Sequence, residues 1–168
     1  MSWSDRRGVL AGLGAAALLP GCFRPMLAES EAAAALRGRI DLPDGRGRTS
    51  YHLRRRLESL LGTPRQPDHR LEVDLDFRER GLAISEDDSI TRVTLTGTAN
   101  WRLFRRGESG PVLAGREVSE SGYNATGSLY AAQITRRDIE RRLARDLAER
   151  VSRGILARAD RVLERGAS

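Results

Sequence analysis

Cys22 is the only cysteine of the 168-residue chain, and it supplies the one thiol available for covalent chemistry. A single thiol forms no disulfide within the chain, so the fold does not use an oxidising compartment for cross-linking. Two interpretations are open: Cys22 is an ordinary free cysteine of a folded domain, or it is modified. The residues that precede it favour modification.

The residues before Cys22 have the composition of a secretory signal. Arg6 and Arg7 provide a positive flank, and residues 9–19 are almost all apolar. This stretch is 11 residues long, whereas a membrane-spanning helix needs about 20 apolar residues. We therefore expect a removable signal peptide over residues 1–21. The arginine pair is compatible with twin-arginine export, but it also occurs in ordinary signals, which we favour.

The end of this signal reads LPGC over residues 19–22 and resembles the lipobox of bacterial lipoproteins. The resemblance implies cleavage before Cys22, a diacylglycerol on its thiol and an acyl chain, such as palmitate, on its amine. Because each buried CH₂ contributes about 0.8 kcal/mol, three chains would anchor the protein firmly. We expect residues 22–37 to form a lipidated anchor segment and residues 38–165 a single domain.

All 29 basic residues of the chain are arginines. Codon bias in a GC-rich genome explains most of this preference, but a planar guanidinium also matches phosphate oxygens in a bidentate manner. Residues 22–168 contain 27 arginines and 22 acidic residues, which gives a net charge of +5. Outside the cytoplasm, such a chain is expected to meet a phosphorylated lipid rather than nucleic acid.

The sequence contains no pattern that indicates catalysis. His52 and His69 have no cysteine or carboxylate cluster at metal-ligand spacing, and we expect both on a helix surface or in a loop. Asp87 and Asp88 precede an expected strand, where a solvated turn is the common explanation. We therefore expect no enzymatic activity, no metal and no cofactor beyond the acyl groups on Cys22.

Hydrophobic periodicity predicts a first amphipathic helix over residues 50–61. Thr49 is a suitable N-cap, and Gly62 and Pro64 end the helix. The alanine-rich segment 28–36 is compatible with one or two further helical turns.

A second, longer helix is predicted from about residue 130 to 163, with an apolar stripe that starts at Ile134. Its surface contains two pairs at a spacing of four residues, Asp138 with Arg142 and Glu149 with Arg153. This helix would be about 45 Å long, close to the roughly 40 Å of the longest expected strand. We therefore expect the helix to lie along an elongated sheet.

Strict alternation of apolar and polar residues predicts strands over residues 71–78 and 92–103. A weaker pattern predicts a third strand over residues 112–121, after a hairpin loop at 106–110, and a short strand is expected at 39–42. The predicted fold class is α+β: a two-layer sandwich of two helices on a mixed, mostly antiparallel sheet of about four strands.

Three segments together resemble the LPS-assembly lipoprotein family LptE in its alphaproteobacterial form. Residues 22–26, CFRPM, are similar to the family's Cys-Gly-Phe-Arg-Pro-Leu start without its glycine, and residues 51–57, YHLRRRL, resemble its first helix. Residues 121–131, SGYNATGSLYA, followed by an arginine-rich helix, are the most specific part. The resemblance implies an outer-membrane lipoprotein on the periplasmic side, in a one-to-one complex as a plug in the LptD β-barrel, that binds lipopolysaccharide (LPS) and helps deliver it to the outer leaflet.

The resemblance also suggests which arginines bind LPS phosphates. Arg92 stands at the entry of the longest strand and Arg142 near the basic start of the long helix, and both correspond to basic positions of the family pattern. The alternative for Arg92 is an ion pair with Asp87 or Asp88.

A small-residue loop is expected over residues 123–129, and it provides candidate contacts for the partner. Tyr123, Asn124 and Tyr130 lie in or beside it, and tyrosine is enriched at interfaces because its apolar ring has a polar tip. The alternative is an ordinary connecting loop.

Three other functions compete with LPS assembly. An accessory lipoprotein of a phospholipid or other envelope transport system would share the lipobox and a small α+β domain. A lipid-anchored hydrolase would need a nucleophile and a base that the sequence does not offer. A cytoplasmic nucleic-acid binder is suggested by the basic charge alone, and the lipobox argues against it.

Overall fold

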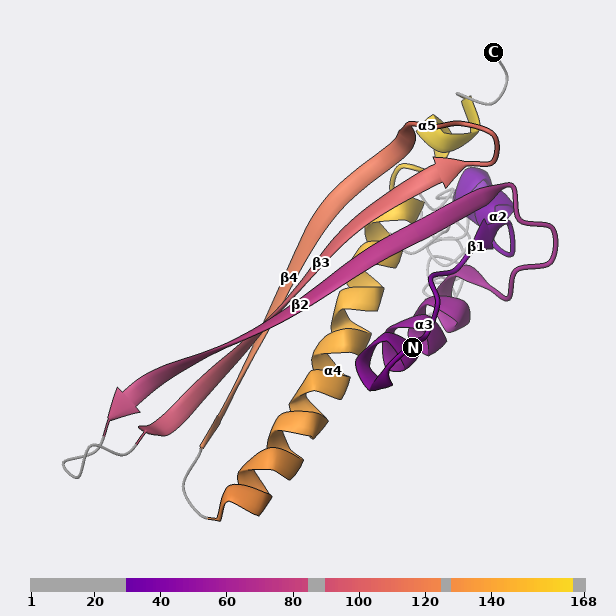
Figure 1. The fold of residues 1–168 in the computed structure, drawn as a ribbon. Helices are drawn as coiled ribbons and strands as arrows, with labels where there is room; N and C mark the ends of the chain where they lie inside the picture. The colour runs from indigo at the N-terminus through magenta and orange to yellow at the C-terminus, as the bar shows by residue number, and fades with distance from the viewer. Residues whose placement is uncertain (1–29, 85–89, 125–127, 165–168) are drawn as a thin grey trace, which may run out of the picture.

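The computed structural model describes residues 30–84, 90–124 and 128–164 (Figure 1). In chain order the elements are α2 (Glu31–Leu36), β1 (Ile40–Asp41), α3 (Arg48–Leu61), β2 (His69–Ile84), β3 (Ile90–Arg105), β4 (Pro111–Asn124), α4 (Leu129–Leu156) and α5 (Ala159–Glu164).

The strands form one sheet in the order β1-β2-β3-β4. β1 runs parallel to β2, whereas β2, β3 and β4 are antiparallel neighbours. The sheet is therefore mixed and mostly antiparallel, as predicted, and the hairpin between β3 and β4 turns at residues 106–110. The predicted α+β fold class is confirmed.

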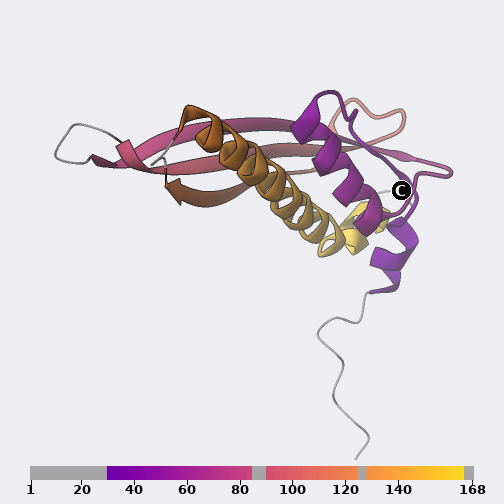
Figure 2. The same cartoon turned by 90° about the horizontal axis from the view of Figure 1, so that it is seen from below.

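Both long helices lie on one side of the sheet, and α4 runs along it (Figures 1 and 2). α4 packs against β3, β4 and α3. The core forms between these layers because every second residue of β3 points toward α4: Leu95, Ala99, Trp101 and Leu103 are all buried. The apolar stripe of α4 faces them, and its members Leu147, Val151 and Ile155 are fully buried.

The helix boundaries differ from the prediction in two places. Thr49 is not the N-cap of α3: the helix begins at Arg48, and its N-cap, Gly47, provides no side-chain hydrogen bond. The long helix is interrupted after Leu156, because the Arg158 amide donates to the Ile155 carbonyl three residues back instead of continuing the α-helical pattern. The stripe resumes in α5, where Ala159 and Val162 are buried.

One of the two predicted ion pairs of the long helix is present. Arg142 Nε lies 3.4 Å from Asp138 Oδ2. Glu149 instead accepts from Arg56 of α3, with 2.7 Å between Arg56 Nη2 and Glu149 Oε1. This contact joins the two helices rather than two turns of one helix.

The strands extend beyond their predicted ends. β2 continues past Arg78 to Ile84, with an irregular register between Gly81 and Ala83. The predicted loop 123–129 is wrong at both ends, because β4 includes Tyr123 and Asn124 and α4 starts at Leu129. Asp87 and Asp88 lie outside the described residues.

The folded part of the chain also includes α2, within the segment expected to be the anchor. Ser30 caps this helix by accepting from the Ala33 amide at 3.1 Å, and Ala33 and Leu36 are buried in the core. Among the described residues, no helix has the length and apolar character needed to cross a membrane.

Candidate functional site

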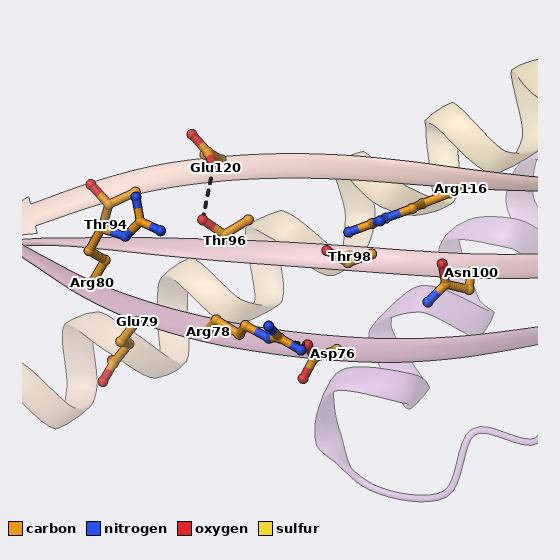
Figure 3. Close-up of a pocket in the computed structure, with 10 residues that line it drawn as sticks. All are labelled: Asp76, Arg78, Glu79, Arg80, Thr94, Thr96, Thr98, Asn100, Arg116 and Glu120. Carbon is orange, nitrogen blue, oxygen red and sulfur yellow. Dashed lines mark hydrogen bonds and ion pairs between the residues drawn. The ribbon is translucent and has the colours of Figure 1, made fainter.

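The sheet face that points away from the helices is polar. Thr94, Thr96, Thr98 and Asn100 alternate along β3 with the core residues, as predicted. With side chains of β2 and β4 they line an open cavity of about 590 Å³ (Figure 3). Every residue that lines this cavity is polar or charged. The surface, called here the polar sheet face, therefore suits a polar partner rather than an acyl chain.

The charges on the polar sheet face are only partly paired. Arg78 Nε lies 2.7 Å from Asp76 Oδ2, and the Thr96 hydroxyl donates to Glu120 at 2.9 Å (Figure 3). Arg80 and Arg116 also line the cavity, and neither has an ion-pair partner within the described part of the chain. Among the described residues, these two guanidinium groups are therefore the unpaired cations of the cavity lining.

Arg92 belongs to the polar sheet face. Arg92 lies two residues before Thr94 in β3, so its side chain points to the same face of the sheet. On this face it extends over Gly122 of β4: its Nε lies 3.9 Å from the position that a Cβ on Gly122 would occupy. Its backbone neighbour on β4 is Asn124. The alternative partners, Asp87 and Asp88, lie outside the described residues.

Arg142 lies on α4 and therefore on the other side of the sheet from Arg92. Its side chain is 62% exposed, and its guanidinium pairs with Asp138. The structure does not bring the two predicted LPS-binding arginines together, so a single phosphate cannot contact both. Their role in LPS binding stays a prediction.

Tyr123 lies on the helix-facing side of β4. Its hydroxyl donates to Glu79 Oε1 at 3.1 Å, and the same carboxylate oxygen lies 3.2 Å from Arg136 Nε of α4. Burial and the neighbouring Glu79 carboxylate raise the pKa of the Tyr123 hydroxyl above its ordinary value. The ring packs against a small apolar cluster that includes Ile139. Tyr123 therefore ties together β2, β4 and α4.

The other two predicted partner residues are exposed. Asn124 ends β4 on the polar sheet face, and Tyr130, in the first turn of α4, is 74% exposed. Tyr123, Asn124 and Tyr130 thus lie near one end of the domain but point in different directions. Cys22, the predicted lipidation site, lies outside the described residues.

The two histidines differ in their surroundings. His52 is half-buried on α3, whereas His69 is buried at the start of β2 rather than in a loop. His69 Nδ1 lies 2.6 Å from Asp68 Oδ1, and Asp68 also pairs with Arg39. Within the described residues, no group of three or more His, Cys, Asp and Glu side chains could hold a metal ion.

A group of apolar side chains on the helical side is exposed, which hydrophobic periodicity does not predict. Tyr51, Tyr130 and Ile134 are 51%, 74% and 49% exposed. The predicted apolar stripe of the long helix starts at Ile134, but the stripe is buried only from Ile139 onward. The spacing of apolar residues along one helix cannot predict this exposure. Whether a side chain of α4 is covered depends on how far the sheet and α3 extend along it.

The fold and these surfaces define a class of protein: a two-layer α+β domain whose polar sheet face and arginine-rich helices are suited to binding. The family model of LptE, described as lipopolysaccharide-assembly, matches residues 30–155. The match covers most of the chain, and the chain belongs to the LptE family.

Solved structures of lipoproteins have the same fold. A lipoprotein of Caulobacter crescentus CB15 is 20% identical with a TM-score of 0.60, over 77% of this chain and 96% of that one. Rare lipoprotein B of Shewanella oneidensis is 13% identical with a TM-score of 0.59, over 74% and 98%. A minor lipoprotein of Acinetobacter baumannii is 18% identical with a TM-score of 0.55, over 70% and 88%. At these identities the likeness concerns the fold alone. No curated protein sequence matches the chain significantly.

Proposed function

We propose that this chain is an outer-membrane lipoprotein, anchored through acyl groups on Cys22, that binds LPS and serves as a plug in the LptD β-barrel during LPS assembly. The match of the LptE family model over residues 30–155 carries this proposal. The polar sheet face supports it, since the lumen of a large outer-membrane barrel is polar.

The position of α2 limits how the domain can stand on the membrane. Cys22 precedes the first residue of α2, Glu31, by nine residues, and nine residues span at most roughly 30 Å. α2 lies at the same end of the domain as α5 and the β3–β4 hairpin, and the first turn of α4 lies at the opposite end (Figure 1). β3 alone, with 16 residues, spans about 50 Å. An anchor on Cys22 would therefore keep the α2 end near the leaflet that holds the acyl groups, and it would leave Asn124 and Tyr130 at the end of the domain farthest from the anchor, where a plug would reach into the barrel.

Two arginine variants test LPS binding. Charge-assisted hydrogen bonds contribute about 1.5–3 kcal/mol each, so Arg92→Ala combined with Arg142→Ala should weaken LPS binding at least tenfold without unfolding the domain. Because the two side chains lie on opposite faces of the sheet, the two single effects should add. The matched control is Arg106→Ala with Arg161→Ala, which removes the same charge at the other end of the domain. Unchanged affinity in the Arg92/Arg142 variant would reject this assignment.

The partner is tested by extraction and crosslinking. A detergent pull-down of the full chain should recover one large β-barrel protein in a one-to-one complex, identified by its mass. Photocrosslinkers at Asn124 and Tyr130 should capture that protein, and both positions are exposed enough to accept the probe. Tyr123 is the less suitable position, since a probe there would remove its hydrogen bond to Glu79.

Two outcomes would contradict the plug proposal. Crosslinks to lipid alone, or only to other copies of this chain, would show that Asn124 and Tyr130 do not contact a barrel protein. Recovery of an inner-membrane transporter in place of a barrel would favour the alternative, an accessory lipoprotein of a phospholipid or other envelope transport system.

A further inference from the structure

A second cavity lies between the first turns of α3 and the N-terminal part of α4, on the helical side of the domain. Its volume is about 410 Å³, and its walls are Arg48, His52, Ile134, Arg137, Asp138 and Arg141. None of these residues belongs to the polar sheet face or was among the predicted site residues. The cavity is called here the interhelical cavity.

The interhelical cavity has an excess of positive charge. Among the described residues of its walls, Asp138 is the only carboxylate, and it is already paired with Arg141 and Arg142. Arg48 and Arg137 have no hydrogen-bond or ion-pair partner within the described part of the chain. The first turn of α3 also contains no acidic residue that would compete for them. Within the described part of the chain, these two guanidinium groups are therefore not engaged by a carboxylate and can pair with an anion.

The pKa of the His52 side chain reflects the positive electrostatic potential in this cavity. Burial, and then the positive charges of Arg145, Arg141 and Arg48, lower the pKa of the His52 imidazole below its ordinary value of 6.5. Arg48 and Arg141 both line the cavity with His52 and lower its pKa, and Arg137 lines the same cavity. An anion bound there would offset charge repulsion that the folded domain otherwise retains.

Exposed apolar side chains gather around the same cavity. The described part of the chain has four exposed large hydrophobic residues, and three of them are Tyr51, Tyr130 and Ile134. Ile134 lines the cavity, and the ring of Tyr51 contacts His52 edge-on at 5.5 Å between centroids. Tyr130 lies one helical turn before Ile134, on the same side of α4. Unpaired arginines beside exposed apolar groups match a ligand with a charged head and an apolar body.

From this combination we infer that the interhelical cavity binds the phosphate group of an anionic amphiphile, with Arg48 and Arg137 on the phosphate and Ile134 and Tyr51 on the apolar part. The inference rests on the proposed function only in that LPS is such an amphiphile. It names a site on the opposite side of the sheet from Arg92.

Histidine NMR on the purified full chain in non-ionic detergent tests the site. The chain has two histidines, so His52 serves as the probe and His69, buried at the start of β2, as an internal reference. Titration with dihexanoyl phosphatidic acid should shift the His52 ring signal saturably and raise its pKa, since a bound anion stabilises the imidazolium. The zwitterionic dihexanoyl phosphatidylcholine should produce no saturable shift, and inorganic phosphate should bind at least tenfold more weakly than phosphatidic acid.

Arg48→Gln combined with Arg137→Gln should weaken phosphatidic acid binding about tenfold or more. Arg106→Gln with Arg161→Gln removes equal charge at the other end of the domain and should change the affinity less than about twofold. Circular dichroism of each variant confirms folding, which is expected because all four side chains are exposed.

Three results would overturn the inference: unchanged affinity in the Arg48/Arg137 variant, equal responses to phosphatidylcholine and phosphatidic acid, or inorganic phosphate binding as tightly as phosphatidic acid. The last would indicate a site for free phosphate. Failure of the site is distinguishable from failure of the proposed function. Capture of the barrel protein without phosphatidic acid binding would reject the site alone, and the reverse would reject the proposed function alone.

Discussion

Trp101 of β3 lies against two backbone segments that have no side chain, and this packing yields a quantitative prediction. The residue is 1% exposed. A Cβ on Gly115 of β4 would lie 2.6 Å from Cζ2, 2.7 Å from Cε2 and 2.8 Å from Nε1 of the ring. A Cβ on Gly154 of α4 would lie 3.2 Å from Cζ2. Because carbon atoms normally pack at about 3.5–4.0 Å, the ring would have to move by roughly 1 Å to accept a methyl group on Gly115.

We expect Gly115→Ala to lower the free energy of unfolding by about 1–3 kcal/mol, the usual cost of overpacking a well-packed core. The upper half of this range is favoured because Gly154 of α4 also approaches the ring and limits where it can move. Urea unfolding can follow the ring directly, since Trp101 is the only tryptophan once residues 1–21 are removed. Gly110→Ala is the control, because no atom lies within 4 Å of a Cβ at that position.

The same substitution in a Trp101→Phe variant separates the steric clash with the Trp101 ring from any general effect of Gly115→Ala. With Trp101→Phe the smaller ring leaves room for the methyl group, so Gly115→Ala should then cost at least about 1 kcal/mol less than in the wild type. Circular dichroism replaces fluorescence in that background. The reasoning would be refuted if Gly115→Ala stayed within about 0.5 kcal/mol of the Gly110→Ala control, or if its cost were equal in both backgrounds.

Two further predictions concern the anchor and pH. Cys22→Ser should leave an uncleaved precursor without added lipid mass, and a bare cysteine in the wild-type protein by mass spectrometry would remove the basis for anchoring. Partial burial alone would raise the pKa of the Asp68 carboxyl, but hydrogen bonds from His69 and Arg39 hold it below its ordinary value of 3.8. The Asp68 carboxylate therefore stabilises the fold above about pH 3.8, and this contribution is lost as the pH falls through the lower pKa of the folded state. Asp68→Asn should accordingly be less stable at pH 7 and lose less stability between pH 5 and 2 than the wild type; parallel urea-unfolding profiles for the two proteins would contradict this.

The strands could be predicted where one face of the sheet is apolar. Leu71, Val73, Leu75 and Phe77 alternate with charged residues, and β3 shows the same period over a longer stretch. A period of two fixes both the strand and the face that it buries. The parallel pairing of β1 with β2 follows from no such signal, because β1 has only two residues.

The end of β2 could not be predicted, because its inward positions change from apolar to polar after Phe77. The next inward residue is Glu79, which accepts from Tyr123 of β4 and pairs with Arg136 of α4. At this end of the domain a hydrogen-bonded ion pair takes the place of apolar contacts between the layers. Hydrophobic periodicity does not detect a contact between polar side chains. For this reason the sequence predicted a loop at Tyr123 instead of the end of a strand.

The break between α4 and α5 is a tertiary effect. Ala157 and Arg158 are good helix formers, so local propensity predicts no interruption there. The break redirects the chain so that α5 packs against α2 and the Arg105 guanidinium donates to the Val162 carbonyl at 2.7 Å. The partners that favour this turn belong to other elements of the fold.

The candidate binding residues also differ in how far the sequence predicts their position. Alternation along a strand predicts the face on which a side chain lies, whereas the packing of helices on the sheet must be known for the others. Arg92 shares the alternation of Thr94 and Thr96, so its face of the sheet follows from the sequence once the strand is recognised. Arg142 can be assigned to a face only after α4 is known to cover the opposite side of the sheet. Arg48 and Arg137 are harder still, because each is one arginine among many on its own helix. Their common cavity arises only where α3 crosses α4 beyond the last apolar contacts of the stripe, and a charge count along either helix gives no indication of it. A basic surface therefore becomes a candidate site only where the fold leaves arginines without carboxylates and sets apolar groups beside them.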